Sequence, residues 1–324
     1  MFFSEDIKRI FIKLAAVVGI AFVAALILNL APTMPSERFR QGSEVAVLEK
    51  VGEEQFPRVS AEAVLVRRMK TGETLFAKNE SSVFAVASIV KIVTALLFAE
   101  RISPLTPVSF PGEIAGYLEP DEKRSAILPN EKLKAEDLLK LIIAESDNDA
   151  AYVAADAVSV RARPELIAAS FPERIAEFVF LMNERGRTLG LSGTNFTNPA
   201  GRDDLLNFST ANDLFVIVRE IYTKAPNLWN VSRIVEGDVY SASGRRYHFE
   251  NTNKLLKEFP AIFGSKTGFT DNAGEALLML YELAPQDPIA VIILKSGNRF
   301  GDGRAILGWL DKNYRITRRE NARK

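Results

Sequence analysis

The chain of 324 residues contains no cysteine and one histidine, His248. The absence of cysteine excludes disulfides, thiolate nucleophiles, thiolate zinc sites and iron–sulfur clusters. The single histidine excludes a multi-histidine metal site, and a Ser/His/Asp triad would have to use this one residue as its base. No Ser or Asp motif flanks His248, so we interpret it as a structural residue of a predicted strand. We expect no metal or other cofactor, and chemistry drawn from Ser, Lys, Asp, Glu, Asn and Tyr.

The sequence also lacks an excess of charge of either sign, because 41 basic residues balance 41 acidic residues. Proteins that bind DNA or RNA usually carry a net positive charge, so we expect no nucleic-acid partner. Internal repeats and low-complexity tracts are absent as well. Hydrophobic residues make up 47% and charged residues 25% of the chain, which is typical of globular proteins.

One long apolar run lies near the N-terminus, where residues 14–28 contain no polar side chain. As a helix, residues 14–30 would span about 25 Å, close to the thickness of a hydrocarbon core. Lys8, Arg9 and Lys13 precede the run, and positive flanks stay on the cytoplasmic side.

We therefore predict a cytoplasmic N-terminus over residues 1–9 and a single-pass anchor in the cytoplasmic membrane over residues 10–31. The rest of the chain would then be extracytoplasmic. The alternative is a cleaved signal peptide and a secreted protein. Cleavage after Ala31 would place Asn29 where a small apolar residue is preferred, which favours the anchor.

The remaining sequence predicts a linker over residues 32–57, a folded domain over 58–315 and a frayed basic tail over 316–324. Residues 61–69 and 74–78 have the pattern of a β-hairpin. Apolar spacing predicts helices at 88–101, 135–144, 149–158, 173–189, 210–222 and 304–312, and strands at 231–240, 245–251, 261–267, 275–283 and 289–295. We expect an α+β fold in which an antiparallel sheet of N- and C-terminal strands packs against helices.

Ser88 and Lys91 lie three positions apart at the start of a predicted helix, so both side chains lie on one face, a turn apart. A hydroxyl and an amine at this spacing make a nucleophile and its base. The amine acts only if apolar surroundings or a nearby cation lower its pKa. The spacing alone also occurs by chance, with the serine as a helix cap and the lysine exposed.

Ser146-Asp147-Asn148 interrupts an apolar helical pattern with three polar residues. Over a cleft, Ser146 could relay a proton and Asn148 could hold an amide. The alternative is a turn that joins two helices, with Asn148 or Asp149 capping the second.

Lys266-Thr267-Gly268 ends a predicted strand. Lysine supplies a cation, threonine a hydroxyl, and glycine permits close backbone approach, which together suit a bound carboxylate. Lys70-Thr71-Gly72 repeats these letters but has the context of a hairpin turn.

Ser-x-x-Lys, Ser-Asp-Asn and Lys-Thr-Gly in this order form the signature of penicillin-binding proteins and serine β-lactamases. Over residues 58–315 the chain resembles the serine D-Ala-D-Ala carboxypeptidases, the low-molecular-weight penicillin-binding proteins. The likeness extends to Ala135-Glu136-Asp137-Leu138-Leu139, Asn198-Pro199-Ala200-Gly201, Asn251-Thr252-Asn253-Lys254-Leu255-Leu256 and Lys266-Thr267-Gly268-Phe269-Thr270.

The resemblance implies a β-lactamase/transpeptidase-like fold and an acyl-enzyme mechanism on a peptidoglycan stem peptide. Ser88 would be acylated, Lys91 would be its base, and Ser146 with Lys266 would return the proton to the leaving D-Ala. Substrate contacts would come from Asn148, Lys266, Thr267, Gly268, Phe269 and Arg299, with the backbone N–H groups of Ser88 and Phe269 as the oxyanion hole. β-Lactam antibiotics would act as covalent inhibitors.

Two departures from the family pattern leave alternatives open. Val86 stands where the family usually has proline. Asp147 stands where carboxypeptidases more often have glycine, and an aspartate at this position slightly favours a β-lactamase. The chain nevertheless lacks the Glu-x-x-Leu-Asn element that class A β-lactamases use for deacylation. A serine β-lactamase, a D,D-endopeptidase and a non-catalytic wall-binding or scaffolding protein remain as alternatives.

Overall fold

The computed structural model describes residues 44–117, 125–283 and 287–320. Residues 45–319 form one compact unit. The predicted anchor over 10–31 lies outside the described residues. Within those residues, no helix combines the length and the apolar character needed to span a membrane. The described unit is an α+β fold, as predicted.

The centre of this unit is an antiparallel five-stranded sheet with the order β10-β11-β12-β2-β3. The predicted N-terminal hairpin is present, and its strand β2 pairs with the C-terminal strand β12. The strands are β2 (Ala63–Arg68), β3 (Thr74–Lys78), β10 (Ile262–Thr270), β11 (Gly274–Tyr281) and β12 (Ile289–Ser296).

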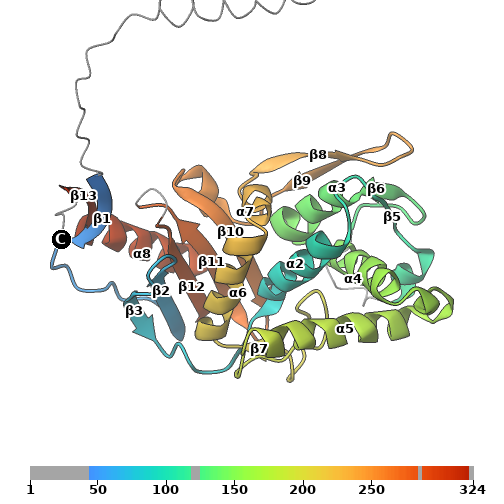
Figure 1. Ribbon diagram of the computed structural model, residues 1–324, viewed down its shortest axis with the longest axis horizontal. Coiled ribbons are helices and arrows are strands. Elements are labelled where there is room, and N and C mark those ends of the chain that lie inside the picture. Colours follow the sequence, from blue (N-terminus) through green and yellow to red (C-terminus); the bar gives the residue numbers. More distant parts are fainter. Residues whose placement is uncertain (1–43, 118–124, 284–286, 321–324) are drawn as a thin grey trace, which may run out of the picture. The chain divides into compact units, whose positions relative to one another are not determined.

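Both faces of the sheet are buried. In β12, Ile292 and Leu294 contribute to one apolar cluster, whereas Val291 and Ile293 contribute to a second. Successive side chains of a strand point to opposite faces, so a strand covered on both sides has an unbroken apolar sequence. Helix α8 (Arg299–Asn313) packs on one face, and α6 (Ala211–Lys224) packs on the other (Figure 1).

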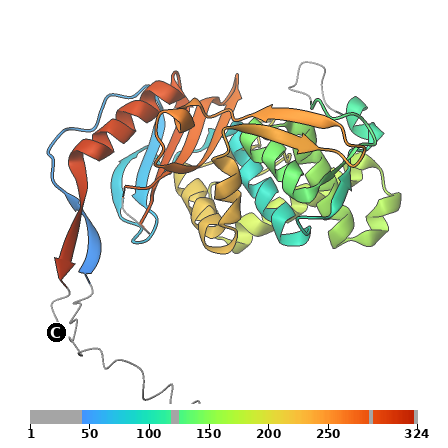
Figure 2. The same cartoon turned by 90° about the horizontal axis from the view of Figure 1, so that it is seen from above.

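Apart from η5 (Lys254–Lys257), which packs against α8, the remaining helices gather beyond the α6 face of the sheet (Figure 2). Helix α2 (Lys91–Arg101) packs against α4 (Asn148–Ala162) and α5 (Phe171–Thr188), and its Leu96 and Phe98 are fully buried. The other helical segments are η1 (Ala87–Val90), η2 (Gly112–Gly116), α3 (Ala135–Lys140), η3 (Leu141–Glu145), η4 (Pro164–Ala168), α7 (Asn227–Ser232) and η5 (Lys254–Lys257).

Four two-stranded ribbons complete the described part of the chain. They are β1 (Glu44–Lys50) with β13 (Tyr314–Glu320), β4 (Phe84–Ala85) with β7 (Phe208–Ser209), β5 (Pro107–Ser109) with β6 (Lys132–Lys134), and β8 (Glu236–Tyr240) with β9 (Arg246–Glu250).

The prediction of a strand over 231–240 is wrong at its start, because Val231 ends up in helix α7. Leu228, Trp229 and Ser232 of α7 are buried, so tertiary packing outweighs the β propensity of this segment. The hairpin β8–β9 is also separate from the central sheet. His248 lies on β9, with its Nδ1 atom 3.0 Å from Asp238 Oδ1 on β8.

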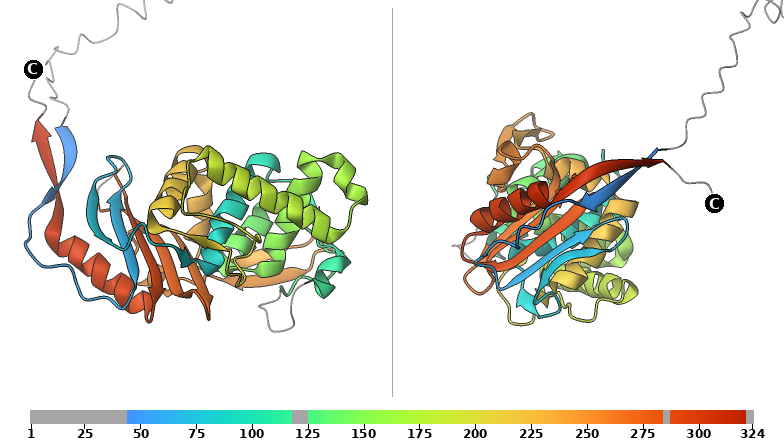
Figure 3. Two further views of the ribbon diagram at one scale, coloured as in Figure 1. Left: turned by 90° about the horizontal axis from the view of Figure 1, so that it is seen from below. Right: turned by 90° about the vertical axis from the view of Figure 1, so that its left-hand side faces the viewer.

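Part of the predicted linker has defined structure and contacts the folded domain. Residues 44–50 form β1, which pairs with β13 (Figure 3). Beyond β1, Phe56 stacks on Phe76, and Trp309 Nε1 donates a 3.0 Å hydrogen bond to the carbonyl of Glu54. The strand β13 extends to residue 320, so it also includes much of the predicted basic tail.

Candidate active site

Ser88 lies in the 3₁₀ turn η1, which leads directly into α2. The residue before it, Ala87, has φ of 48°, in the left-handed region that alanine rarely adopts. Gly201 lies against this turn with φ of +80°, and a Cβ atom there would be 2.0 Å from the carbonyl oxygen of Ala87. Only glycine fits at that position, so the 198–201 loop packs tightly against the turn that carries Ser88.

Lys91 is the first residue of α2 and is 0% exposed. Its Nζ lies 2.8 Å from Ser88 Oγ, 2.7 Å from Asn148 Oδ1 and 2.7 Å from the carbonyl oxygen of Ala200. A neutral amine can donate its two hydrogens to these two carbonyl oxygens. Its lone pair then remains directed at the Ser88 hydroxyl, which is the arrangement that a general base needs.

Ser146 lies between two helices, as predicted. A π-helical turn, η3, ends at Ser146, which has φ of 67°. π-Helical turns occur often at functional sites. The cap of the next helix is Asp147, whose side chain accepts a 2.8 Å hydrogen bond from Ala150 N, rather than Asn148 or Asp149. Asn148 is therefore free of capping and points its amide at Lys91.

Lys266 lies on β10 and is 1% exposed. Its Nζ donates to Ser146 Oγ at 2.8 Å and to the carbonyl oxygen of Thr267 at 2.9 Å. The strand then passes close to the nucleophile, because a Cβ atom on Gly268 would be 2.9 Å from Val86 O and 3.2 Å from Ser88 N. The close approach expected at Gly268 is thus present.

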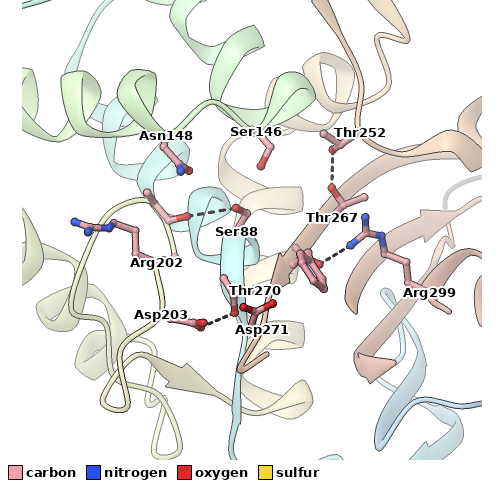
Figure 4. Close-up of a pocket in the computed structure, with 14 residues that line it drawn as sticks. Ser88, Ser146, Asn148, Arg202, Asp203, Thr252, Thr267, Thr270, Asp271 and Arg299 are labelled. Atoms are coloured by element: carbon pink, nitrogen blue, oxygen red, sulfur yellow. Dashed lines mark hydrogen bonds between the residues drawn. The ribbon is translucent and has the colours of Figure 1, made fainter. Parts of the chain in front are cut away.

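These side chains meet at one cavity of about 590 Å³. Figure 4 shows Ser88 near the middle, with Ser146 and Asn148 on one side and Thr267 and Arg299 on another. The residues that line the cavity are Ser88, Ser146, Asn148, Ala200, Gly201, Arg202, Asp203, Thr252, Thr267, Gly268, Phe269, Thr270, Asp271 and Arg299. Lys91 and Lys266 are not among these residues, but each makes a hydrogen bond with a serine that lines the cavity.

Arg299 begins α8, and its Nη1 donates a 2.7 Å hydrogen bond to the carbonyl oxygen of Gly268. Burial lowers the pKa of its guanidinium, and the Glu275 carboxylate opposes that change. Its Nε is buried and has no hydrogen-bond partner among the described residues. The guanidinium is therefore held beside the cavity by its contact with Gly268.

Three residues, Ala200, Thr252 and Asp203, make contacts at the site that the sequence analysis did not predict. The carbonyl of Ala200 contacts Lys91, the Thr252 hydroxyl lies 2.6 Å from that of Thr267, and the Asp203 carboxylate accepts from Thr270 Oγ1 and Asn272 N. Ala200 and Thr252 belong to stretches that carried the family likeness. No residue pattern gave them a chemical role, because Ala200 acts through its backbone carbonyl and Thr252 acts through a contact with a residue of a distant strand.

Two serines that line one cavity, each hydrogen-bonded to a buried lysine, can activate a nucleophile and deliver a proton to a leaving group. Residues 50–296 match the family described as D-alanyl-D-alanine carboxypeptidase, peptidase S11. The chain belongs to this S11 family.

Curated relatives of this S11 family member include carboxypeptidases and endopeptidases. It is 28% identical over 234 residues to the D-alanyl-D-alanine carboxypeptidase DacF of Bacillus subtilis, covering 71% of this chain but only 56% of that protein. It is also 28% identical over 256 residues to the D-alanyl-D-alanine endopeptidase of Pseudomonas aeruginosa, covering 77% of this chain and 76% of the relative.

Solved structures show the same fold as this S11 family member. The Streptomyces K15 DD-transpeptidase superimposes with a TM-score of 0.71 at 22% identity, over 79% of this chain and 98% of that one. Penicillin-binding protein D2 of Listeria monocytogenes, in its ampicillin-bound form, gives 0.64 at 25% identity, over 79% and 98% of the two chains.

Proposed function

We propose that this protein is a serine D-Ala-D-Ala carboxypeptidase that removes the terminal D-Ala from peptidoglycan stem peptides. One observation carries the proposal. The hydroxyl of Ser88 lies 2.8 Å from the buried Lys91 amine, and the Lys266–Ser146 pair opens into the same cavity. Membership of the S11 family and the curated carboxypeptidase relatives support the choice of substrate.

In the acylation step, Ser88 Oγ attacks the carbonyl carbon of the penultimate D-Ala while Lys91 Nζ takes the hydroxyl proton. The backbone N–H groups of Ser88 and Phe269 stabilise the oxyanion. When the C–N bond breaks, the leaving D-Ala amine receives a proton from Ser146, which Lys266 assists. Water then hydrolyses the ester: the Lys91 ammonium returns its proton to Ser88 Oγ, and the proton that the attacking water loses restores the Ser146–Lys266 pair.

The substrate is held on both sides of Ser88. Asn148 binds the amide of the stem peptide, and Gly268 lets the backbone of β10 approach the reacting bond. The hydroxyl of Thr267 and the guanidinium of Arg299 bind the terminal carboxylate. The place of Arg299 in the lining of the cavity, with its Nη1 held by the carbonyl oxygen of Gly268, supports this role.

β-Lactam antibiotics would acylate the same hydroxyl, since they offer a reactive amide and a carboxylate to the same groups. The ampicillin-bound structure of the Listeria relative supports this expectation. A stable penicilloyl adduct on Ser88 would argue against the β-lactamase alternative, because a β-lactamase hydrolyses that ester quickly.

A D,D-endopeptidase is the second candidate, because several curated relatives carry that name. Such an enzyme cuts cross-links between stem peptides instead of their free ends.

We also propose that residues 10–31 anchor the protein in the cytoplasmic membrane, with the catalytic domain outside. The apolar sequence of that segment and its basic flank support this placement.

The test is to incubate the full-length protein with a stem pentapeptide and, separately, with a cross-linked dimer. We expect release of free D-Ala from the pentapeptide by the wild type and none by Ser88→Ala. Faster cleavage of the dimer would favour the endopeptidase. If neither substrate reacts, the scaffolding alternative is favoured.

A further inference from the structure

The hydroxyl of Thr252 lies at the wall of the cavity, 2.6 Å from the hydroxyl of Thr267 (Figure 4). Thr252 belongs to the segment that follows β9, and Thr267 belongs to β10. Both residues line the cavity that contains Ser88. The proposed function gives Thr267 a role at the substrate carboxylate but leaves Thr252 without one.

A hydroxyl has one hydrogen, so the 2.6 Å contact allows two arrangements. In the first, Thr267 donates to Thr252, and Thr252 donates to the carbonyl oxygen of Ala144 at 3.4 Å. In the second, Thr252 donates to Thr267, and the hydrogen of Thr267 is free to point into the cavity.

The distances favour the second arrangement once an anion is bound. The 3.4 Å contact to Ala144 is long for a hydrogen bond between a hydroxyl and an oxygen, and that carbonyl already accepts from Thr252 N at 3.0 Å. A hydrogen bond from Thr267 to a carboxylate is charge-assisted and therefore stronger than the contact that Thr252 gives up.

The backbone fixes Thr252 for this task. The hydrogen bond from Thr252 N to Ala144 O ties it to the π-helical turn that carries Ser146. Thr267 is 4% exposed and lies on the central sheet, so its side chain has little room to move. The hydroxyl of Thr252 is thereby placed 2.6 Å from that of Thr267, and its other acceptor, Ala144 O, is more distant at 3.4 Å.

We infer that Thr252 is a positioning residue, which donates its hydrogen to Thr267 and so directs the Thr267 hydrogen at the terminal carboxylate of the substrate. The inference rests on the proposed carboxypeptidase function. It predicts that Thr252 is important only for substrates that end in a carboxylate.

The experiment compares two pentapeptides, one ending in D-Ala and one in D-alanine amide, on the full-length wild type and on Thr252→Val. Valine keeps the shape of threonine and removes the hydroxyl. We expect kcat/KM for the acid to fall about tenfold, mostly through KM, because the carboxylate is bound equally before and during the reaction. For the amide we expect less than a twofold change.

Two further variants separate positioning from packing. Thr252→Ser restores the hydroxyl and should recover the acid substrate. Thr94→Val removes another buried hydroxyl, which donates to Pro199 O at 2.7 Å, and any loss it causes should be equal for both peptides. Titration with fluorescent penicillin gives the concentration of folded active sites, so a partly unfolded variant does not distort the comparison.

Equal losses on acid and amide in Thr252→Val, or no loss on either, would overturn the inference while leaving the carboxypeptidase function intact. Failure of Thr252→Ser to recover the acid substrate would overturn it as well. A wild type that releases the terminal residue from neither peptide contradicts the proposed function itself, and the inference with it.

Discussion

At the scale of single residues, the site depends on how many hydrogens each group can donate. Lys91 is buried between Ser88 Oγ and two carbonyl oxygens, so a neutral amine there can donate to both carbonyls and accept from the hydroxyl. The sequence predicted the pair Ser88 and Lys91 because their spacing is local. Ala200 was noted only as part of a stretch that carries the family likeness, and its carbonyl contacts Lys91 from a loop more than a hundred residues away.

Substitution of Lys91 by methionine keeps the volume of the side chain and removes the base. We expect the rate of acylation by benzylpenicillin to fall at least about 100-fold, since general bases contribute factors of about 10² to 10⁴. Stopped-flow or quenched measurement of adduct formation gives the rate. The control is Lys224→Met at the exposed end of α6, where the rate should not change. An unchanged rate in Lys91→Met would remove Lys91 from the mechanism.

At the scale of elements, the nucleophile turn η1 is fitted between a loop and a strand. Gly201 and Gly268 allow these two segments to approach the backbone around Ser88 at distances that no side chain permits. The sequence predicted the role of Gly268 from its place at a strand end. The left-handed Ala87 and the π-helical turn before Ser146 were not predicted, because tertiary packing imposes these conformations and local propensity does not.

Gly201 and Gly244 form a matched pair for testing this fit. Both have positive φ, +80° and +84°, but a Cβ on Gly201 meets Ala87 O at 2.0 Å, whereas one on Gly244 meets nothing within 4 Å. We expect Gly244→Ala to cost only backbone strain, about 1–2 kcal/mol, without loss of activity. Gly201→Ala should cost more stability and lower the acylation rate at least about tenfold, because the turn must move. Thermal unfolding and adduct formation measure the two effects, and similar behaviour of both variants would contradict the fit.

The contact between the sheet and α8 can be tested by pH. Tyr281 on β11 donates a 2.8 Å hydrogen bond to Asp311 on α8. Burial raises the pKa of the Tyr281 hydroxyl above its usual range, and the Asp311 carboxylate raises it further. In the unfolded chain the group still titrates near pH 10, so above that pH the folded state binds more protons and stability falls as pH rises.

Wild type should therefore lose stability faster than Tyr281→Phe between pH 9 and pH 11. The difference in slope is at most about 1.4 kcal/mol per pH unit, the value for one proton. Chemical denaturation at a series of pH values measures it. Parallel curves for the two proteins would show that Tyr281 does not titrate differently on folding.

At the scale of the whole molecule, the sequence predicted the α+β class and the joining of the N-terminal hairpin to the C-terminal strands. The hydrophobic pattern of the strands contains that information. The separate pairing of β8 with β9 and of β1 with β13 was missed. Such pairings depend on which distant segments meet, and periodicity within one segment cannot show this.

The predicted anchor and the described unit should be separable in function. Because every proposed catalytic residue lies within residues 45–319, we expect deletion of residues 1–31 to leave kcat/KM for a soluble pentapeptide unchanged within about twofold. The full-length protein should sediment with membranes and the truncated protein should not. Co-sedimentation of the truncated protein would place the membrane contact elsewhere in the chain.

The position of β10 as the last strand of the central sheet has a consequence for which molecules can react. Residues 267–270 of this strand line the cavity, so an incoming peptide can add to the sheet there as a sixth, extended strand. Backbone groups recognise any extended chain and ignore its side chains. A flexible single peptide can therefore bind along this edge, whereas the segments of a folded protein, which are already paired or coiled, do not offer free backbone groups to it.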